Sequence, residues 1–402
     1  MEKISRRKLH ILRDKLIFTW VIVFIYLLGR CLPLYGVDTS AYSILPGNAE
    51  ILLMQVIGGD VNRYSLFALG ISPYMISSVL TQIVVSCRNP GSRARTSPKK
   101  VNQAQIALTF GFALFQAVIH VQNLKFRVMD AELFLTELIC VAEMVTGVMT
   151  ILWLAGRNKK YGLGGQTVLI YINIIDGMFT TLMGHRPEDL GVPLGVSLAV
   201  MVIMIIMENG EKRIPVQRIS IHNIYADKNY LAIKLNPVGV MPVMFSTAFF
   251  MLPQLIITAL LFLFPEREKL IWWKENMVLT RPVGIGIYIL ILYLLTIGFS
   301  MIFISPGDAA EQLLKSGDSI LNLHAGKDTQ KYLTREVLGI GVFSATVMSL
   351  CLGVPMVLQL RGNLERELVM LPASVMMLTS LWCSLYQEFL AIKSYEAYEP
   401  FI

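Results

Sequence analysis

The stretch Val283-Gly-Ile-Gly-Ile-Tyr-Ile-Leu-Ile-Leu-Tyr-Leu-Leu-Thr-Ile-Gly-Phe-Ser-Met-Ile-Phe-Ile304 decides the fold class of this chain. It has no charged residue over 22 positions, and an α-helix needs about 20 apolar residues to cross the hydrocarbon core of a bilayer. The rest of the chain has the same character, because 54% of its 402 residues are hydrophobic and only 16% are charged. An ordinary soluble domain carries about 25% charged residues, so the sequence predicts a polytopic membrane protein.

Ten stretches are long and apolar enough to span a membrane. Their apolar runs are continuous and do not alternate with polar residues, which favours helices over the strands of a β-barrel. We therefore expect an all-α polytopic membrane protein with ten transmembrane helices. These spans are Leu16–Leu34, Tyr64–Ser86, Ala104–His120, Phe134–Ala155, Gly164–Met183, Leu190–Met207, Val238–Phe264, Val283–Ile304, Val337–Leu358 and Leu368–Leu390.

The distribution of lysine and arginine predicts the orientation of these spans. Loops on the side of the amino terminus carry 24 of these residues, and loops on the opposite side carry 10. Basic residues accumulate on the cytoplasmic side of membrane proteins, and an even number of spans places both termini on one side. We expect a multi-pass protein of the plasma membrane with both termini in the cytoplasm. The basic segment Met1–Lys15 precedes a long apolar run without a small-residue cleavage site, which indicates a retained first span.

The segment between the first two spans, Ser43–Asn62, has an apolar core that is too short to cross a bilayer. A short re-entrant helix ended by Gly58-Gly59 is one interpretation of Ala49–Gly59. An amphipathic helix on the outer surface of the membrane is the other, and the sequence leaves both open.

Two cytoplasmic loops, Glu208–Asn236 and Ser305–Arg335, are unusually long and carry structural signals of their own. In the first, polar and apolar residues alternate at Ile219–Asn223 and again from Tyr230, which predicts a hairpin. In the second, Asp308 and Glu311 have the spacing of a capping box, and Gly317 is suited to end the helix. Long loops with structure of their own indicate a docking surface for a soluble partner.

The chain offers little for catalysis. The five cysteines and five histidines are scattered, without CxxC motifs or histidine pairs, so no metal site, cofactor or enzymatic activity is expected. Glu143 is the most central ionisable residue within a span. It could carry protons in a secondary transporter, or it could pair with a neighbouring helix or face a water-filled cavity. No nucleic-acid partner is expected.

Proline residues lie at the start of the second and seventh spans, at Pro73 and Pro237. They indicate that these two helices line an internal passage. Proline frees backbone carbonyl groups, which the hydrocarbon core tolerates only against other protein or a cavity.

Several short motifs follow one another in order along nearly the whole chain. They are Ala68-Leu-Gly-Ile-Ser-Pro-Tyr74, Tyr161-Gly-Leu-Gly164, Arg213-Ile-Pro-Val-Gln217, Leu235-Asn-Pro-Val-Gly-Val-Met-Pro-Val-Met-Phe245, Lys315-Ser-Gly317, Gly326-Lys-Asp-Thr-Gln-Lys-Tyr332 and Lys393-Ser-Tyr-Glu396. Together they resemble the SecY family, the channel-forming subunits of preprotein translocases.

The resemblance implies two pseudo-symmetric five-helix halves, residues 1–183 with helices 1–5 and residues 184–402 with helices 6–10. It also implies a lateral gate between the second and seventh helices, and a plug at about residues 43–62. The implied plug residues are Ile51, Leu52, Leu53, Val56, Gly58 and Gly59. The implied pore ring consists of Ile71, Met75, Thr167, Tyr171, Met244 and Ser374, or Val375 beside it.

The partners that the resemblance implies are an unfolded secretory preprotein, the lipid bilayer, small SecE/SecG-like membrane subunits and a SecA-type motor ATPase. The motor would dock on residues 208–236 and 305–335. The implied docking residues are Lys212, Arg213, Arg218, His324 and Lys327.

Three departures point to a specialised branch of the family. Thr167, Tyr171 and Ser374 make the implied ring more polar than usual, and His324 stands where the family carries an arginine. The segment after the last span is also short. The chain resembles most the accessory branch in Gram-positive bacteria, which exports serine-rich glycosylated adhesins with its own SecA homologue. The alternatives are a housekeeping SecY of general secretion and, in a different class, a proton-coupled secondary transporter that uses Glu143.

Overall fold

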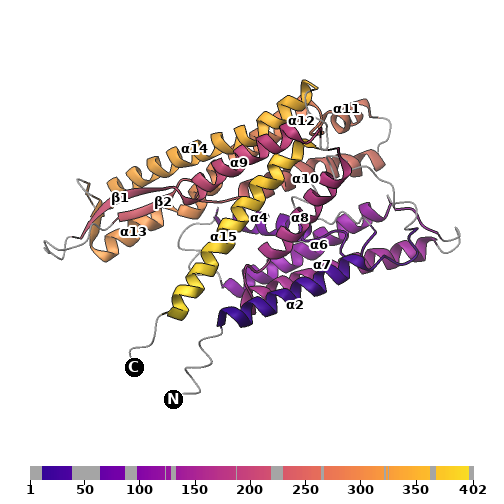
Figure 1. Cartoon of the computed structure of the whole chain (residues 1–402), viewed down its shortest axis with the longest axis horizontal. Coiled ribbons are helices and arrows are strands. Elements are labelled where there is room, and N and C mark those ends of the chain that lie inside the picture. The colour runs from indigo at the N-terminus through magenta and orange to yellow at the C-terminus, as the bar shows by residue number, and fades with distance from the viewer. Residues whose placement is uncertain are drawn as a thin grey trace, which may run out of the picture. The chain divides into compact units, whose positions relative to one another are not determined.

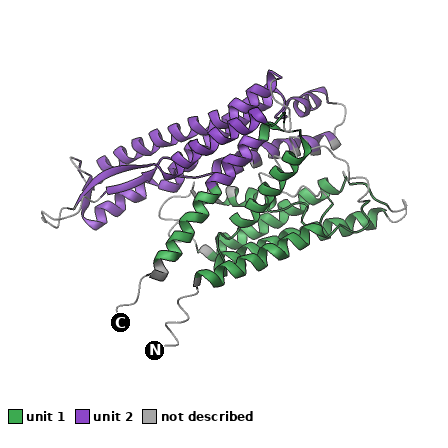
Figure 2. Cartoon of the chain, viewed as in Figure 1, with its two compact units in different colours: residues 1–190, 366–370, 381–402 green, residues 191–365, 371–380 purple. Residues whose placement is uncertain are grey.

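The computed structural model of the chain describes residues 11–38, 64–86, 97–122, 124–127, 133–186, 188–218, 230–263, 267–320, 323–324, 326–362 and 368–397. Helices account for most of these residues (Figure 1). The chain divides into two compact units (Figure 2). Unit 1 comprises Met1–Leu190, Arg366–Met370 and Leu381–Ile402, and unit 2 comprises Gly191–Glu365 and Leu371–Ser380. The family-based division at residue 183 stays a prediction.

The regular elements of unit 1 within its described residues are all helices, and two isolated β-bridges, Pro33 with Ser65 and Val37 with Phe126, join its loops. Its elements are α2 (Ile11–Cys31), α4 (Ser72–Ser86), α6 (Pro98–Val121), α7 (Leu133–Tyr161), α8 (Thr167–Gly184), the 3-10 turn η2 (Leu368–Met370) and the second part of α15 (Leu371–Ala397). Its core includes small residues of α6, Ala113 and Ala117, against Cys140 and Met144 of α7. Small side chains on one helix allow the two backbones to approach closely, as is common between helices in membranes.

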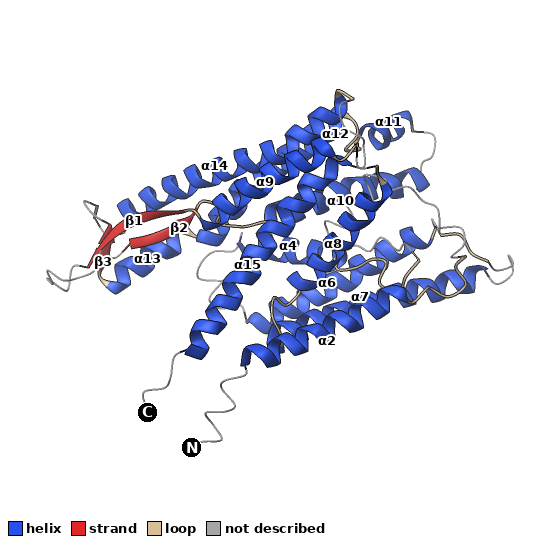
Figure 3. Cartoon of the chain, viewed as in Figure 1, coloured by secondary structure: helices blue, strands red, loops and turns tan. Residues whose placement is uncertain are grey.

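Unit 2 combines helices with a small sheet (Figure 3). Its elements are α9 (Gly191–Asn209), β1 (Glu211–Arg218), β2 (Tyr230–Lys234), α10 (Met241–Leu263), α11 (Glu268–Asn276), α12 (Pro282–Ile304), α13 (Pro306–Ser316), β3 (Asp318–Ile320), α14 (Lys327–Leu360) and the first part of α15. The sheet has the order β2-β1-β3, with both pairs antiparallel. Ile214, Ile233 and Ile320 of the three strands pack with Leu333 and Val337 of α14.

The structure confirms a membrane fold built from helices, to which the small sheet in the two long loops is added. Eight helices within the described residues are long and apolar enough to cross a bilayer, and they coincide with the third to tenth expected spans. The first two expected spans also contain helices, but α2 carries charges near both ends and the described part of α4 has only 15 residues. The total of ten transmembrane helices therefore stays a prediction.

Exposed apolar side chains on α2 indicate a lipid-facing surface. Trp20, Phe24 and Leu28 are spaced four residues apart and are 72%, 63% and 52% exposed. Residues with this spacing lie on one face of a helix. Such an apolar stripe is unfavourable in water, and it is the expected surface of a helix that contacts hydrocarbon.

The expected pairing of two antiparallel strands in this loop is confirmed, but the first strand is β1 at Glu211–Arg218, and the cytoplasmic location of the loop stays a prediction. Ile219–Asn223, where the alternating pattern placed that strand, lies outside the described residues. Gly317 ends α13 with a left-handed φ of 72°, as expected. The prediction that a capping box at Asp308 starts this helix is wrong. Helix α13 begins earlier, at Pro306, and Asp308 lies in its first turn. Proline is favoured at a first helical position, where its fixed φ fits and no amide hydrogen is needed.

Candidate functional site

The first two implied pore residues, Ile71 and Met75, lie where α4 begins in unit 1. Both are 3% exposed, and the Met75 amide donates a hydrogen bond to the Ile71 carbonyl at 3.1 Å. The Ser72 hydroxyl donates to the Leu69 carbonyl at 2.9 Å and thereby supports the start of the helix. These bonds place Ile71 and Met75 one turn apart.

Thr167 and Tyr171 lie one turn apart at the start of α8 in the same unit. The Thr167 amide donates to the Gly164 carbonyl at 2.8 Å, so the turn between α7 and α8 fixes the position of Thr167. The Gly164 amide donates a hydrogen bond to the carboxylate of Glu388 at 3.2 Å. Both Thr167 and Tyr171 are half-buried, and the ring of Tyr171 lies 6.3 Å from that of Trp382.

Met244 of α10 and Ser374 of α15 belong to unit 2 and are buried, at 3% and 5% exposure. Val375 beside Ser374 is half-buried. The six implied ring residues are thus divided between the units, and their assembly into one ring stays a prediction. The implied plug residues lie outside the described residues.

The implied docking residues Lys212 and Arg213 are engaged within unit 2. The Lys212 ammonium donates a hydrogen bond to Glu336 of α14. That hydrogen bond raises the pKa of Lys212 above its ordinary value, because it stabilises the charged form. Arg213 pairs with Glu211 at 2.6 Å and its guanidinium lies 4.7 Å from the ring centre of Tyr230. Lys212 therefore joins the sheet to α14, and Arg213 joins β1 to β2.

The remaining docking residues differ in their surroundings. Arg218 ends β1, and its backbone pairs with Asp318 of β3. His324 is exposed, and its carbonyl accepts a hydrogen bond from Thr329 at 2.9 Å. Lys327 is exposed and is the first residue of α14. Within the described ranges, Lys327 forms no ion pair.

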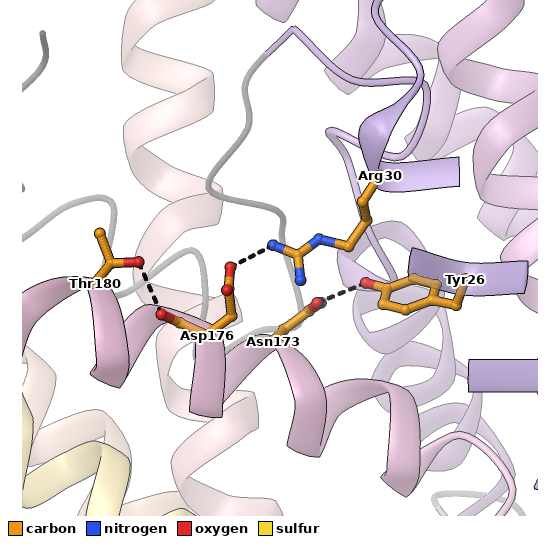
Figure 4. A network of polar contacts seen from close by, with 5 residues as sticks. All are labelled: Tyr26, Arg30, Asn173, Asp176 and Thr180. Atoms are coloured by element: carbon orange, nitrogen blue, oxygen red, sulfur yellow. Dashed lines mark hydrogen bonds and ion pairs between the residues drawn. The ribbon is translucent and has the colours of Figure 1, made fainter. Parts of the chain in front are cut away.

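A polar network joins α2 to α8 in unit 1, and sequence reasoning did not pair its members (Figure 4). The Arg30 guanidinium lies 2.7 Å from the Asp176 carboxylate, and the Tyr26 hydroxyl donates to Asn173 at 2.7 Å. Arg30 and Asp176 are the kind of ionisable residues within spans that signal function or pairing, but nothing in their local sequence identifies the partner.

Glu208 is a buried acid that the sequence did not single out. It occupies the last turn of α9, is 6% exposed, and accepts hydrogen bonds from Asn236 and Ser380. The available signal was its position at the end of an apolar run. Glu143, by contrast, accepts a hydrogen bond from the Tyr35 amide at 3.0 Å, which favours its structural interpretation over a proton relay. Among the described residues, no cluster of side chains suits a metal ion.

Known proteins resemble this chain over most of its length. The sequence profile of the SecY family matches residues 65–385. The accessory Sec system protein translocase subunit SecY2 of Streptococcus agalactiae is 30% identical over 398 residues, which cover 97% of this chain and 96% of that protein. The protein of the same name from Leuconostoc gelidum subsp. gasicomitatum is 28% identical over 411 residues, covering 96% and 95%.

A solved structure described as "The structure of a protein conducting channel" has the same fold. The TM-score is 0.67 at 17% sequence identity, over 96% of this chain and 93% of that one. The fold and the matches define a multi-pass membrane protein of the class that forms protein-translocation channels. The chain belongs to the SecY family.

Proposed function

We propose that this chain is the central channel-forming subunit of an accessory preprotein translocase in the plasma membrane, with serine-rich glycosylated adhesins as its cargo. The observation that carries the proposal is the similarity over nearly the full chain to proteins named as accessory SecY2 subunits. The polar implied ring and His324 support the same branch. A housekeeping SecY of general secretion is the second candidate, favoured by the family match alone.

In the proposed mechanism, the chain contributes a passage and no catalytic step. A narrow ring of largely apolar residues expels water and ions, while an extended polypeptide can still slide through. Ile71, Met75 and Met244 would supply the apolar part of the ring, and Thr167, Tyr171 and Ser374 the polar part. The plug segment, residues 43–62, would close the outer side, and α4 and α10 would form the lateral gate.

The energy would come from a SecA-type ATPase on the cytoplasmic side, and small SecE/SecG-like subunits would accompany the channel. Both termini and both long loops would face the cytoplasm, as the 24 basic residues on that side indicate. The sheet β2-β1-β3 and α13 would provide the docking surface in the described parts of these two loops.

Depletion of this protein from its native cells should leave one adhesin in the cytoplasm, because an accessory channel serves dedicated cargo. The measurement is quantitative proteomics of the secreted, membrane and cytoplasmic fractions. Retention of many unrelated secretory proteins would instead identify the housekeeping channel, and unchanged secretion would reject both. Depletion of an unrelated polytopic membrane protein is the control for general membrane stress.

Lys327→Glu should weaken motor binding by about 1 kcal/mol, or roughly fivefold in Kd, because it reverses an exposed charge on the docking surface. A glutamate at this position does not harm the fold, since acidic residues are favourable in the first turn of a helix. The measurement is binding of the motor to the channel in nanodiscs at low and high salt.

The matched control for this variant is Lys274→Glu, which makes the same charge change on an exposed lysine of α11. Lys274 belongs to the side opposite the cytoplasm in the predicted orientation, so it should leave motor affinity unchanged. Equal affinities for the wild type and Lys327→Glu would remove Lys327 from the docking surface.

A further inference from the structure

The carboxylate of Glu208 is the centre of a buried polar cluster in unit 2. Its Oε1 atom accepts a hydrogen bond from Asn236 Nδ2 at 2.9 Å and another from the Ser380 hydroxyl of α15. Asn236 Oδ1 in turn accepts a hydrogen bond from the Ser344 hydroxyl of α14 at 3.3 Å. Asn236, Ser344 and Ser380 are at most 3% exposed. One acidic side chain thus joins α9, α14 and α15 to the segment that precedes α10.

That segment, Leu235–Val240, is the whole connection between β2 and α10. At its start, the Leu235 amide donates to the Gly210 carbonyl at 2.9 Å, which ties β2 to the residue after α9. Near its end, Gly239 has a φ of +65°, and a Cβ there would lie 3.7 Å from Glu208 Oε1 and 3.6 Å from Ser380 Oγ. The segment therefore lies directly on the cluster, in a backbone conformation that favours glycine.

A buried polar network with all its partners specifies one arrangement, because any other leaves polar atoms without hydrogen bonds in a medium of low dielectric constant. The Glu208 cluster therefore fixes the position of the segment that leads into the first turn of α10. That turn carries the implied pore residue Met244. The hairpin β1–β2 lies at the other end of the same short connection. A movement of β2 can therefore be transmitted to α10 through this short segment, which Glu208 contacts.

We propose that Glu208 is a positioning residue that couples the cytoplasmic hairpin to α10, by holding the segment Leu235–Val240 through Asn236 and Ser380. The inference rests on the proposed function, in which the motor docks on the hairpin and α10 is a helix of the lateral gate. It adds the residue through which motor action reaches the gate.

The test measures cargo translocated per ATP hydrolysed in liposomes that contain the full-length channel, the ATPase that copurifies with it and the adhesin retained on depletion. Glu208→Ala should lower this ratio by about tenfold while motor affinity stays unchanged, because allosteric coupling is lost and docking is not. Glu208→Gln should restore most of it, since the amide oxygen can still accept both hydrogen bonds. Thr296→Val, which removes a buried hydroxyl bonded within α12, is the control for a purely structural loss.

A wild-type ratio in folded Glu208→Ala would overturn the proposal, and so would a Glu208→Gln variant no better than Glu208→Ala. If Glu208→Ala does not fold, Ser380→Ala removes one donor and leaves Asn236 in place. Ser380→Ala should also lower the amount of cargo translocated per ATP hydrolysed. A wild-type ratio in this variant would also overturn the proposal. If the wild-type channel moves no adhesin, the proposed function fails instead, which distinguishes the two failures.

Discussion

Asp176→Ala is expected to lower the free energy of unfolding by about 3 kcal/mol, because it removes a carboxylate that is paired with a buried arginine. The Arg30 side chain is 7% exposed and lies 2.7 Å from Asp176. A buried guanidinium cannot escape the loss by releasing its proton, so it keeps its charge without this partner. Because Asp176 itself is 47% exposed, the effect should lie at the lower end of the range for buried pairs. The measurement is equilibrium unfolding in mixed micelles.

Two further variants separate the charge from the packing at this site. Arg30→Met in the Asp176→Ala background should recover much of the lost stability, since it removes the buried charge that has lost its partner at position 176 and keeps an apolar side chain of similar length. Asp189→Ala, at an exposed acid in the same unit, should change stability by less than about 0.5 kcal/mol. An Asp176→Ala variant as stable as Asp189→Ala would show that the ion pair contributes nothing.

The apolar spans could be predicted from sequence because a bilayer imposes one dominant rule, about 20 apolar residues in a helix. Strand β1 could not be predicted, because its sequence contains Pro215 and proline is unfavourable within a sheet. The register explains how the structure tolerates it. Residues up to Pro215 pair with β2, and residues from Val216 onward pair with β3 on the other edge. Proline thus lies at the changeover, where the missing amide hydrogen costs the least.

The polar partners could not be predicted for a different reason. Arg30 and Asp176 are 146 residues apart in the chain, and Glu208 and Ser380 are 172 apart. Local patterns report the period of a helix or the alternation of a strand, and neither carries information on such distant pairs. Motif order implied Thr167 and Tyr171 as pore residues, but the interactions that hold them emerge only from the fold.

Asn158→Leu is the strongest test of how the start of α8 is held, and it should lower the free energy of unfolding by about 3 kcal/mol. Asn158 is fully buried, and its amide donates to the carbonyls of Leu163 at 2.8 Å and Gly165 at 2.9 Å. Its Oδ1 atom also accepts from the Thr19 hydroxyl of α2 at 3.0 Å. Leucine has a similar size, so the variant creates little cavity and removes the hydrogen bonds. Each buried carbonyl left without a donor costs about 1–3 kcal/mol, which gives the expected sum.

The matched control is Asn276→Leu on α11, a helix without buried residues, where the asparagine amide donates to the Trp272 carbonyl and accepts from Arg281 at 3.3 Å, both at the exposed surface. That variant should change stability by less than about 0.5 kcal/mol, because water can replace the lost bonds. The turn that Asn158 holds also carries the Gly164 carbonyl that accepts from the Thr167 amide. Asn158→Leu should therefore raise the potassium conductance of liposomes containing the folded variant, since Thr167 and Tyr171 lose their fixed positions. Wild-type stability and conductance in Asn158→Leu would show that the turn between α7 and α8 is held by packing rather than by this side chain.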